Sequence, residues 1–167
     1  MARVWRLGDN VNTDQIIPGR YNVTTDRAEL AKRCLCEHRP DFAGGVAAGD
    51  VLVAGRNFGC GSSREHAAVA LKASGLAAVV AISFARIFYR NAINIGLPVL
   101  IAPEAAALED GDEIKIDAAA GVIRDLTHAR VFQAEPLPEF VQRIVEAGGI
   151  IPLVRQQGRL TAPAMAD

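Results

Sequence analysis

One segment of the sequence combines glycines with two serines and an arginine, and these residue types are suited to binding an anion. It runs Gly55-Arg56-Asn57-Phe58-Gly59-Cys60-Gly61-Ser62-Ser63-Arg64-Glu65-His66. Glycines allow the backbone to bend and to approach a ligand closely. The serines supply hydroxyl groups, and Arg64 offers a planar, permanently charged group that matches a carboxylate or a phosphate. The segment therefore predicts an anion-binding corner that carries two hydroxyls.

Hydrophobic patterning predicts the elements that position this segment. Residues 50–54 read as a short buried strand and residues 62–74 as a helix, so the glycines lie in the turn between them. The first turn of a helix has unpaired backbone N–H groups and a partial positive charge, which also favour an anion. Ser62 and Glu65 have the spacing of a capping box, and helix capping alone, worth about 1 kcal/mol, is the alternative role for the serines. The adjacent serines, Arg64 and the glycine-rich approach together favour an anion site.

Three familiar motifs do not fit the segment. No lysine precedes the serines, as a P-loop requires. Arg64 stands where a dinucleotide-binding fingerprint has its third glycine, and Gly61 directly precedes Ser62, which breaks the nucleophile-elbow pattern. Cys60 and His66 could form a thiol–imidazole pair, but no third group that would orient the histidine is evident.

Composition and patterning predict one α/β domain. The chain has 167 residues, of which 50% are apolar and 22% charged, and its net charge of -1 offers no basic surface for nucleic acid. Between residues 50 and 102, the order strand, helix, strand, helix, strand is typical of a parallel sheet covered by helices. The other expected elements are a first strand at 3–7, helices at 26–36 and 138–147, a hairpin of 112–117 with 122–126, and a final strand at 150–154.

The sequence predicts a cytoplasmic protein that does not associate with membranes. Its longest apolar stretch, residues 76–82, has seven residues, whereas a membrane span needs roughly 20. The N-terminal residues do not have the pattern of a signal peptide. The three cysteines, Cys34, Cys36 and Cys60, are an odd number, which argues against a disulfide framework, and they lack the spacing of an iron–sulfur ligand set. No metal site is expected in this chain.

Three segments resemble a known family. Residues 57–67 are very similar to the signature of the small subunits of 3-isopropylmalate dehydratase, and they also resemble the swivelling domain of aconitases and homoaconitases. Residues 8–18 resemble the family pattern G-D-x-V-x-T-D-x-I-I-P, and residues 83–92, Ser-Phe-Ala-Arg-Ile-Phe-Tyr-Arg-Asn-Ala, resemble a third family segment. The matches run in order from about residue 7 to residue 102, and the chain has the length of a free-standing small subunit.

The resemblance implies a fold and an activity. The fold is the swivelling β/β/α three-layer domain, with a mainly parallel central sheet and a second, smaller sheet, spanning residues 1–167 with a frayed tail from about residue 156. The activity is that of a hydro-lyase small subunit, which isomerises 2-isopropylmalate and 3-isopropylmalate by dehydration and rehydration in leucine biosynthesis. The partner is a large subunit, in a heterodimer or heterotetramer, whose cysteines hold a [4Fe-4S] cluster. This chain alone would hold no cofactor.

The resemblance also assigns roles to individual residues. Ser62 is the catalytic base, and Arg64, together with Ser63, binds a carboxylate of a small di- or tricarboxylate substrate. A serine alkoxide can form only in a dry site, beside Arg64 and the helix N–H groups. Asp14 is expected to orient the site, with an ordinary turn acid as an equally weighted alternative, and Asn57 to shape the loop.

A further loop bears on the substrate. Residues 20–25 follow the second family segment, and the resemblance places them around the variable part of the substrate, with Val23 and Thr24 in contact with it. Isopropylmalate enzymes commonly read Tyr-Leu-Arg-Thr here and homocitrate enzymes Tyr-Leu-Val-Tyr-Thr, whereas this chain reads Tyr-Asn-Val-Thr-Thr. Homoaconitase and 2,3-dimethylmalate dehydratase small subunits are therefore alternatives. A stand-alone anion-binding module and an independent serine or cysteine hydrolase are alternatives of another class.

Overall fold

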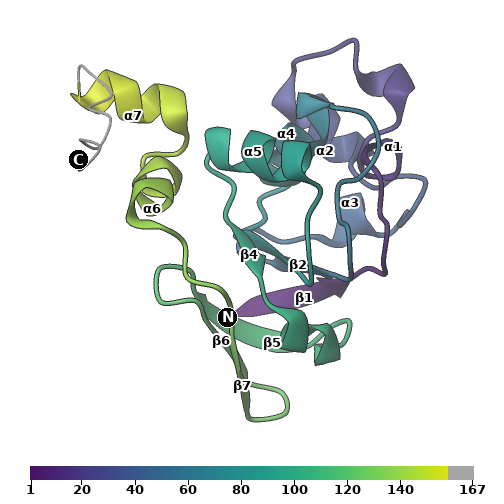
Figure 1. Ribbon diagram of the computed structural model, residues 1–167. Coiled ribbons are helices and arrows are strands. Elements are labelled where there is room, and N and C mark those ends of the chain that lie inside the picture. The colour runs from purple at the N-terminus through teal and green to yellow at the C-terminus, as the bar shows by residue number, and fades with distance from the viewer. Residues whose placement is uncertain (158–167) are drawn as a thin grey trace.

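A seven-stranded sheet runs through the molecule, and its two halves differ in strand direction (Figure 1). The computed structural model describes residues 1–157. The strand order is β4-β3-β2-β1-β5-β6-β7. The parallel half contains β1 (Ala2–Arg6), β2 (Val51–Ala54), β3 (Ala78–Ala81) and β4 (Val99–Ile101). The antiparallel half contains β5 (Glu113–Asp117), β6 (Val122–Asp125) and β7 (Arg130–Gln133), and it joins β1 through β5.

Helices cover one face of the parallel half (Figure 1). These are α1 (Thr13–Ile16), α2 (Arg27–Arg33), α3 (Phe42–Gly45), α4 (Glu65–Ala73) and α5 (Arg86–Asn94). Near the C-terminal end of the described chain, α6 (Glu139–Glu146) and α7 (Ile150–Gln157) pack beside α5. Two short 3₁₀ helices, η1 (Gly19–Tyr21) and η2 (Pro103–Ala107), complete the elements. No helix within residues 1–157 is long and apolar enough to cross a membrane.

Two hydrophobic cores lie on opposite faces of the parallel strands. Leu52 and neighbouring side chains pack against the helices, whereas Val51 and Val53 pack against Ile114 and Ile123 of the antiparallel half. Side chains of a strand point alternately to its two faces, so strands covered on both sides are apolar throughout. The three layers expected from the sequence are therefore present, and β1 connects the smaller antiparallel sheet to the parallel one.

Some expected elements differ from the structure. The final strand predicted at 150–154 is wrong, because these residues belong to α7. A short apolar run is ambiguous between strand and helix, and Pro152 is tolerated in the first helical turn, where its missing N–H would be unpaired. The strand β7 was not predicted. Gln156 and Gln157, expected in a frayed tail, still belong to α7, and the rest of that tail lies outside the described residues.

Candidate active site

The Ser62 loop, defined as residues 55–64, leaves the end of β2 and is anchored by an aromatic residue. Phe58 is fully buried, and its ring meets that of Phe88 edge to face at 5.1 Å between centroids. Gly59 lies directly against this contact, where an added Cβ would come within 2.2 Å of Cγ of Phe88, and its φ of +81° also favours glycine. The glycine thus lets the loop cross over the start of α5.

A second segment, residues 9–13, runs alongside the Ser62 loop. The N–H of Gly59 donates to the carbonyl of Val11 at 2.8 Å, and the N–H of Thr13 donates to the carbonyl of Cys60 at 2.9 Å. The carboxylate of Asp9 accepts a hydrogen bond from the N–H of Arg56 at 2.7 Å. These bonds bring the start of α1, which carries Asp14, to the loop that carries the serines.

The serines do not cap the helix that follows them. Helix α4 begins at Glu65, its N-cap is Arg64, and no side chain caps it, so the predicted capping box and the predicted helix start at Ser62 are wrong. Gly61 has a φ of +95° and Arg64 is extended, which holds the intervening residues outside the helix. Ser62 and Ser63 are consequently exposed, and capping does not occupy their hydroxyls.

Arg64 pairs with Asp14 across fifty positions of sequence. Nη1 of Arg64 donates to Oδ1 of Asp14, and the exposed fractions of the two side chains are 27% and 61%. Gly19 lies against the same guanidinium, because a Cβ there would come within 2.8 Å of Nη1. A guanidinium has five N–H donors, so Arg64 can be held by Asp14 and still bind a carboxylate. The sequence-predicted Ser62, Ser63, Arg64 and Asp14 thus come from one corner of the fold.

Asn57 lies at the outer part of the same loop. Its backbone has a φ of 56°, its N–H donates to Oγ of Ser83 at 2.8 Å, and its side-chain amide donates to Oδ1 of Asn10 at 3.2 Å. Asparagine tolerates the left-handed conformation better than most residues. These contacts fit the expected role of Asn57 in shaping the loop.

The loop predicted to contact substrate projects from the molecule. The side chain of Val23 is 92% exposed, whereas the hydroxyl of Thr24 accepts the N–H of Asp26 at 3.1 Å, just before α2. Thr25 at the end of this loop and Glu65 at the start of α4 line the same hollow, which has a volume of about 220 Å³. The loop therefore adjoins the start of α4, but Val23 itself contacts little of this chain.

Thr13 is a member of the site that the sequence did not single out. Its hydroxyl donates to the backbone carbonyl of Ser62 at 3.1 Å and lies 3.5 Å from Oγ of Ser62, and the residue is only 3% exposed. In the sequence it is one of several small polar residues in a turn. Only the resemblance of residues 8–18 to a family segment could have drawn attention to it.

The cysteines do not form a site for an iron–sulfur cluster. Cys34 is completely buried, and burial raises the pKa of its thiol to about 12. Iron–sulfur ligation requires thiolates, which are favoured where the pKa is lowered. Within residues 1–157, the one group of potential metal ligands consists of Asp112, Asp125 and His128, without a cysteine. The residues of this chain therefore do not fit a [4Fe-4S] cluster.

The three potential metal ligands Asp112, Asp125 and His128 belong to an ion-pair network within the chain. Nε of Arg130 donates to Oδ2 of Asp125 at 2.8 Å, and Nδ1 of His128 lies 3.2 Å from the same oxygen. Burial alone would raise the pKa of Asp125, but the hydrogen bonds from Arg130 and His128 outweigh it and lower that pKa. The positive charge that these carboxylates need is therefore supplied by Arg130.

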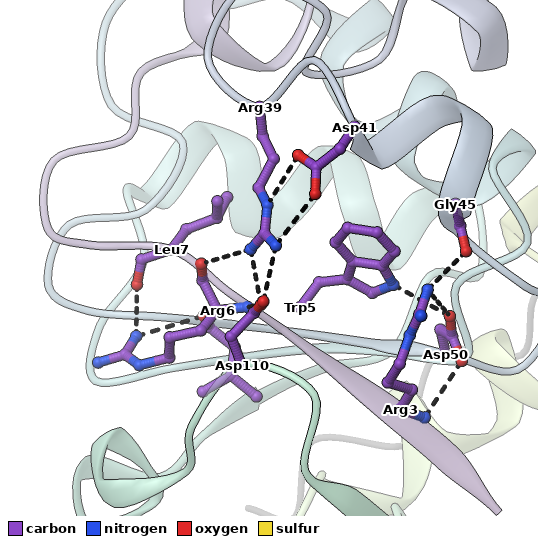
Figure 2. Close-up of polar contacts among 10 residues, drawn as sticks. Arg3, Trp5, Arg6, Leu7, Arg39, Asp41, Gly45, Asp50 and Asp110 are labelled. Atoms are coloured by element: carbon purple, nitrogen blue, oxygen red, sulfur yellow. Dashed lines mark hydrogen bonds and ion pairs between the residues drawn. The ribbon is translucent and has the colours of Figure 1, made fainter.

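A second polar cluster, the Trp5 network of Arg3, Trp5, Arg39, Asp50 and Asp110, lies around β1 (Figure 2). Asp50 accepts the indole N–H of Trp5 at 3.0 Å and the backbone N–H of Arg3 at 3.1 Å. Arg39 donates to both carboxylate oxygens of Asp110, at 2.6 and 2.7 Å. The guanidinium carbons of Arg3 and Arg39 lie 4.5 and 4.7 Å from the centroid of the Trp5 ring. The cluster ties β1 to segments before β2 and before β5.

Curated relatives establish the family of this chain. The 3-isopropylmalate dehydratase small subunit of Moorella thermoacetica is 57% identical to it, over 90% of this chain and 92% of that protein. The chain belongs to the family of 3-isopropylmalate dehydratase small subunits. The 2,3-dimethylmalate dehydratase small subunit of Eubacterium barkeri is also similar, with 56% identity over 89% of this chain and 91% of that protein.

Family membership agrees with the fold. Residues 45–104, which include the Ser62 loop, match the aconitase C-terminal domain family. The crystal structure of 3-isopropylmalate dehydratase from Methanocaldococcus jannaschii superposes with a TM-score of 0.90 at 44% identity, covering 94% of this chain and 93% of that one. The family and fold class that the sequence motifs predicted are confirmed.

Proposed function

We propose that this chain is the small subunit of a hydro-lyase that interconverts 2-isopropylmalate and 3-isopropylmalate by dehydration and rehydration, as a step in leucine biosynthesis. The observation that carries the proposal is the corner where exposed Ser62 and Ser63 stand beside Arg64, which Asp14 holds. Small-subunit relatives with that substrate in their names, at up to 57% identity, support it.

Each side chain of the corner has a role in this chemistry. Arg64 and Ser63 bind a carboxylate of the substrate, and Asp14 fixes the direction of the Arg64 guanidinium. Oγ of Ser62 takes the proton from the carbon next to a carboxylate during dehydration and returns a proton during hydration. The positive charge of Arg64 favours the ionised serine, and its effect grows when water is excluded.

The same corner supports the proposal that the chain acts with a partner. Dehydration also removes a hydroxyl group from the substrate, and the side chains of this corner already have other roles, because Asp14 accepts from Arg64 while Arg64 and Ser63 bind a carboxylate. We therefore propose that a large subunit supplies the missing half of the active site and holds the [4Fe-4S] cluster, for which the cysteines of this chain are unsuited. The exposed face of the Ser62 loop would meet that subunit.

One observation favours a second substrate. The loop Tyr21–Thr25 lacks the arginine that isopropylmalate enzymes commonly carry there, and the Eubacterium barkeri relative is named for 2,3-dimethylmalate. Val23 could contact an alkyl group, while Asn22 and Thr24 would give the pocket a more polar wall. We place 3-isopropylmalate first and 2,3-dimethylmalate second, with the homoaconitase substrate as the remaining alternative.

Reconstitution tests the proposal. The chain is purified alone and together with a large subunit encoded beside it, and both preparations are assayed with 3-isopropylmalate, 2,3-dimethylmalate and homocitrate. The expected result is turnover by the complex only, with the highest kcat/KM for 3-isopropylmalate. Robust activity of the chain alone would contradict the division of labour. A preference for another acid would select that alternative, and anion binding by the chain without any activity in the complex would favour a stand-alone binding module.

A further inference from the structure

Thr13 is placed to control the hydroxyl of Ser62. It is the first residue of α1, and its backbone N–H is bonded to the carbonyl of Cys60 at 2.9 Å, so its main chain is fixed to the Ser62 loop. Its hydroxyl reaches Ser62 at two atoms, the backbone oxygen at 3.1 Å and Oγ at 3.5 Å. With 3% of the residue exposed, water has little access to this contact from the Thr13 side.

A threonine hydroxyl carries one hydrogen, and the hydrogen can rotate about the bond from Cβ to Oγ1. While Ser62 is neutral, Thr13 donates this hydrogen to the carbonyl of Ser62. When Oγ of Ser62 loses its proton, it becomes the stronger acceptor, because hydrogen bonds to an ionised oxygen are about twice as strong as neutral ones. Rotation of the hydroxyl and a small shortening of the 3.5 Å separation would then place the hydrogen on the ionised serine.

We propose that Thr13 is a positioning residue for the reaction: it holds Ser62 outside the helix in the resting state and donates its hydroxyl hydrogen to Oγ of Ser62 once that oxygen has ionised. The inference rests on the proposed function, since it requires Ser62 to act as the base. The ionised Ser62 would then be stabilised by two groups, the hydroxyl of Thr13 at the start of α1 and the positive charge of Arg64. Before dehydration, Oγ of Ser62 releases its own proton to water. The ionised oxygen then takes the proton from the substrate carbon and gives it back during hydration, while Thr13 keeps its own.

Matched variants of the complex with the large subunit test this role. Thr13→Val keeps the shape and removes the hydroxyl, whereas Thr13→Ser keeps the hydroxyl. We expect Thr13→Val to lower kcat by about tenfold or more with KM within about threefold, since the loss acts on the proton transfer. The acid limb of the kcat–pH profile should move to higher pH, because an ionised Ser62 without this donor forms less readily. Thr13→Ser should have a kcat and an acid limb close to those of the wild type.

Two controls separate this inference from the function on which it rests. Thr127→Val removes a hydroxyl that accepts the N–H of Glu113 in the antiparallel half, far along the sheet from the Ser62 loop in strand order, so kcat should not change. Ser62→Ala tests the base: if it retains turnover, the proposed function fails. If Ser62→Ala is inactive but Thr13→Val keeps its kcat, the role of Thr13 is wrong and the proposed function stands. The same conclusion follows if Thr13→Val loses kcat but the acid limb does not shift, or if Thr13→Ser does not restore kcat. Thr13→Ala, which removes the hydroxyl without needing space for a branched side chain, replaces Thr13→Val if that variant does not assemble.

Discussion

The Trp5 network and the Ser62 loop both set arginines beside aspartates, but they differ in how completely the chain satisfies those groups. Asp50 is 5% exposed and accepts hydrogen bonds from Trp5, Arg3 and the N–H of Ala47. Arg39 uses its donors on Asp110, Asp41 and the carbonyl of Arg6. In the Ser62 loop, Arg64 has one ionic partner among residues 1–157, which is Asp14, and the adjacent serines are exposed.

Polar clusters are available for chemistry only where the chain leaves some of their groups accessible. A charge whose partners all lie within the chain contributes to the fold, and a ligand would have to replace those partners at a cost. The hollow beside Arg39 and Trp5, about 130 Å³ in volume, is lined by such paired groups. The Ser62 loop instead leaves Ser62 and Ser63 exposed and Arg64 partly exposed, so a ligand can reach them without replacing a buried partner.

The largest predicted effect on stability separates the two regions. Asp50→Ala leaves the indole of Trp5 and the N–H groups of Arg3 and Ala47 without their acceptor, so we expect a loss of about 3 kcal/mol in the free energy of unfolding. Chemical denaturation of the purified chain measures it. Asp110→Ala is the matched control, because the side chain of Asp110 is 50% exposed and a half-exposed carboxylate should contribute less to stability, about 1 kcal/mol. Equal losses in the two variants would show that burial does not distinguish these carboxylates.

The effect of Asp50 should also depend on pH. Burial alone would raise the pKa of Asp50, but its hydrogen bonds from Ala47, Trp5 and Arg3 outweigh burial and lower that pKa. Its contribution to stability is therefore present above the unfolded-state pKa of about 3.9 and is lost as the pH falls through the folded-state pKa. The difference between the wild type and Asp50→Ala should shrink below about pH 4, and a constant difference would contradict the shift.

The next effect concerns Arg64, which is proposed to bind a substrate carboxylate. Arg64→Lys keeps the positive charge but loses the planar guanidinium with its paired N–H donors. The reconstituted complex should therefore lose about tenfold or more in kcat/KM, which is about 1.4 kcal/mol or more. Stability should hardly change, since Asp14 and Arg64 form a partly exposed pair. Asp14→Asn, which keeps Arg64 but removes its ionic partner, should have a smaller effect in the same direction. Unchanged kcat/KM in Arg64→Lys would mean that the guanidinium group does not bind the substrate.

The smallest effect concerns substrate preference. Exchanging Val23 and Thr24 for the arginine-containing pattern should change the ratio of kcat/KM between 3-isopropylmalate and 2,3-dimethylmalate, by about 1 kcal/mol. Stability should not change, because Val23 is 92% exposed. Ratios of kcat/KM measured for both complexes check this, and an unaltered ratio would show that the loop does not set specificity.

The sequence predicted the parallel half of the fold because local signals were strong there: apolar strands, glycine turns and the N-cap Asp26, which accepts from Ala28 and Glu29. The Trp5 network was not predictable, since Trp5 and Asp50 lie 45 positions apart and nothing in either neighbourhood marks them as partners. The pairing of Arg64 with Asp14 spans 50 positions. Only the family resemblance placed both at one site.

Local rules also failed inside the site itself. Ser62 and Glu65 have capping-box spacing, but the positive φ of Gly61 and the bond from Thr13 hold Ser62 outside the helix. That failure is informative, because a serine that caps a helix uses its hydroxyl on the helix backbone, whereas Ser62 is an exposed residue whose hydroxyl lies 3.5 Å from that of Thr13.

The turnover of Ser62→Ala in the reconstituted complex decides whether Ser62 is the catalytic base, with Ser63→Ala as the neighbouring control. We expect Ser62→Ala to lower kcat by about a thousandfold with little change in KM, because a base acts in the transition state. Under the proposed function Ser63 binds the substrate carboxylate, so Ser63→Ala should raise KM more than it lowers kcat. Near-normal turnover of Ser62→Ala would contradict the account and show that Ser62 is not the base.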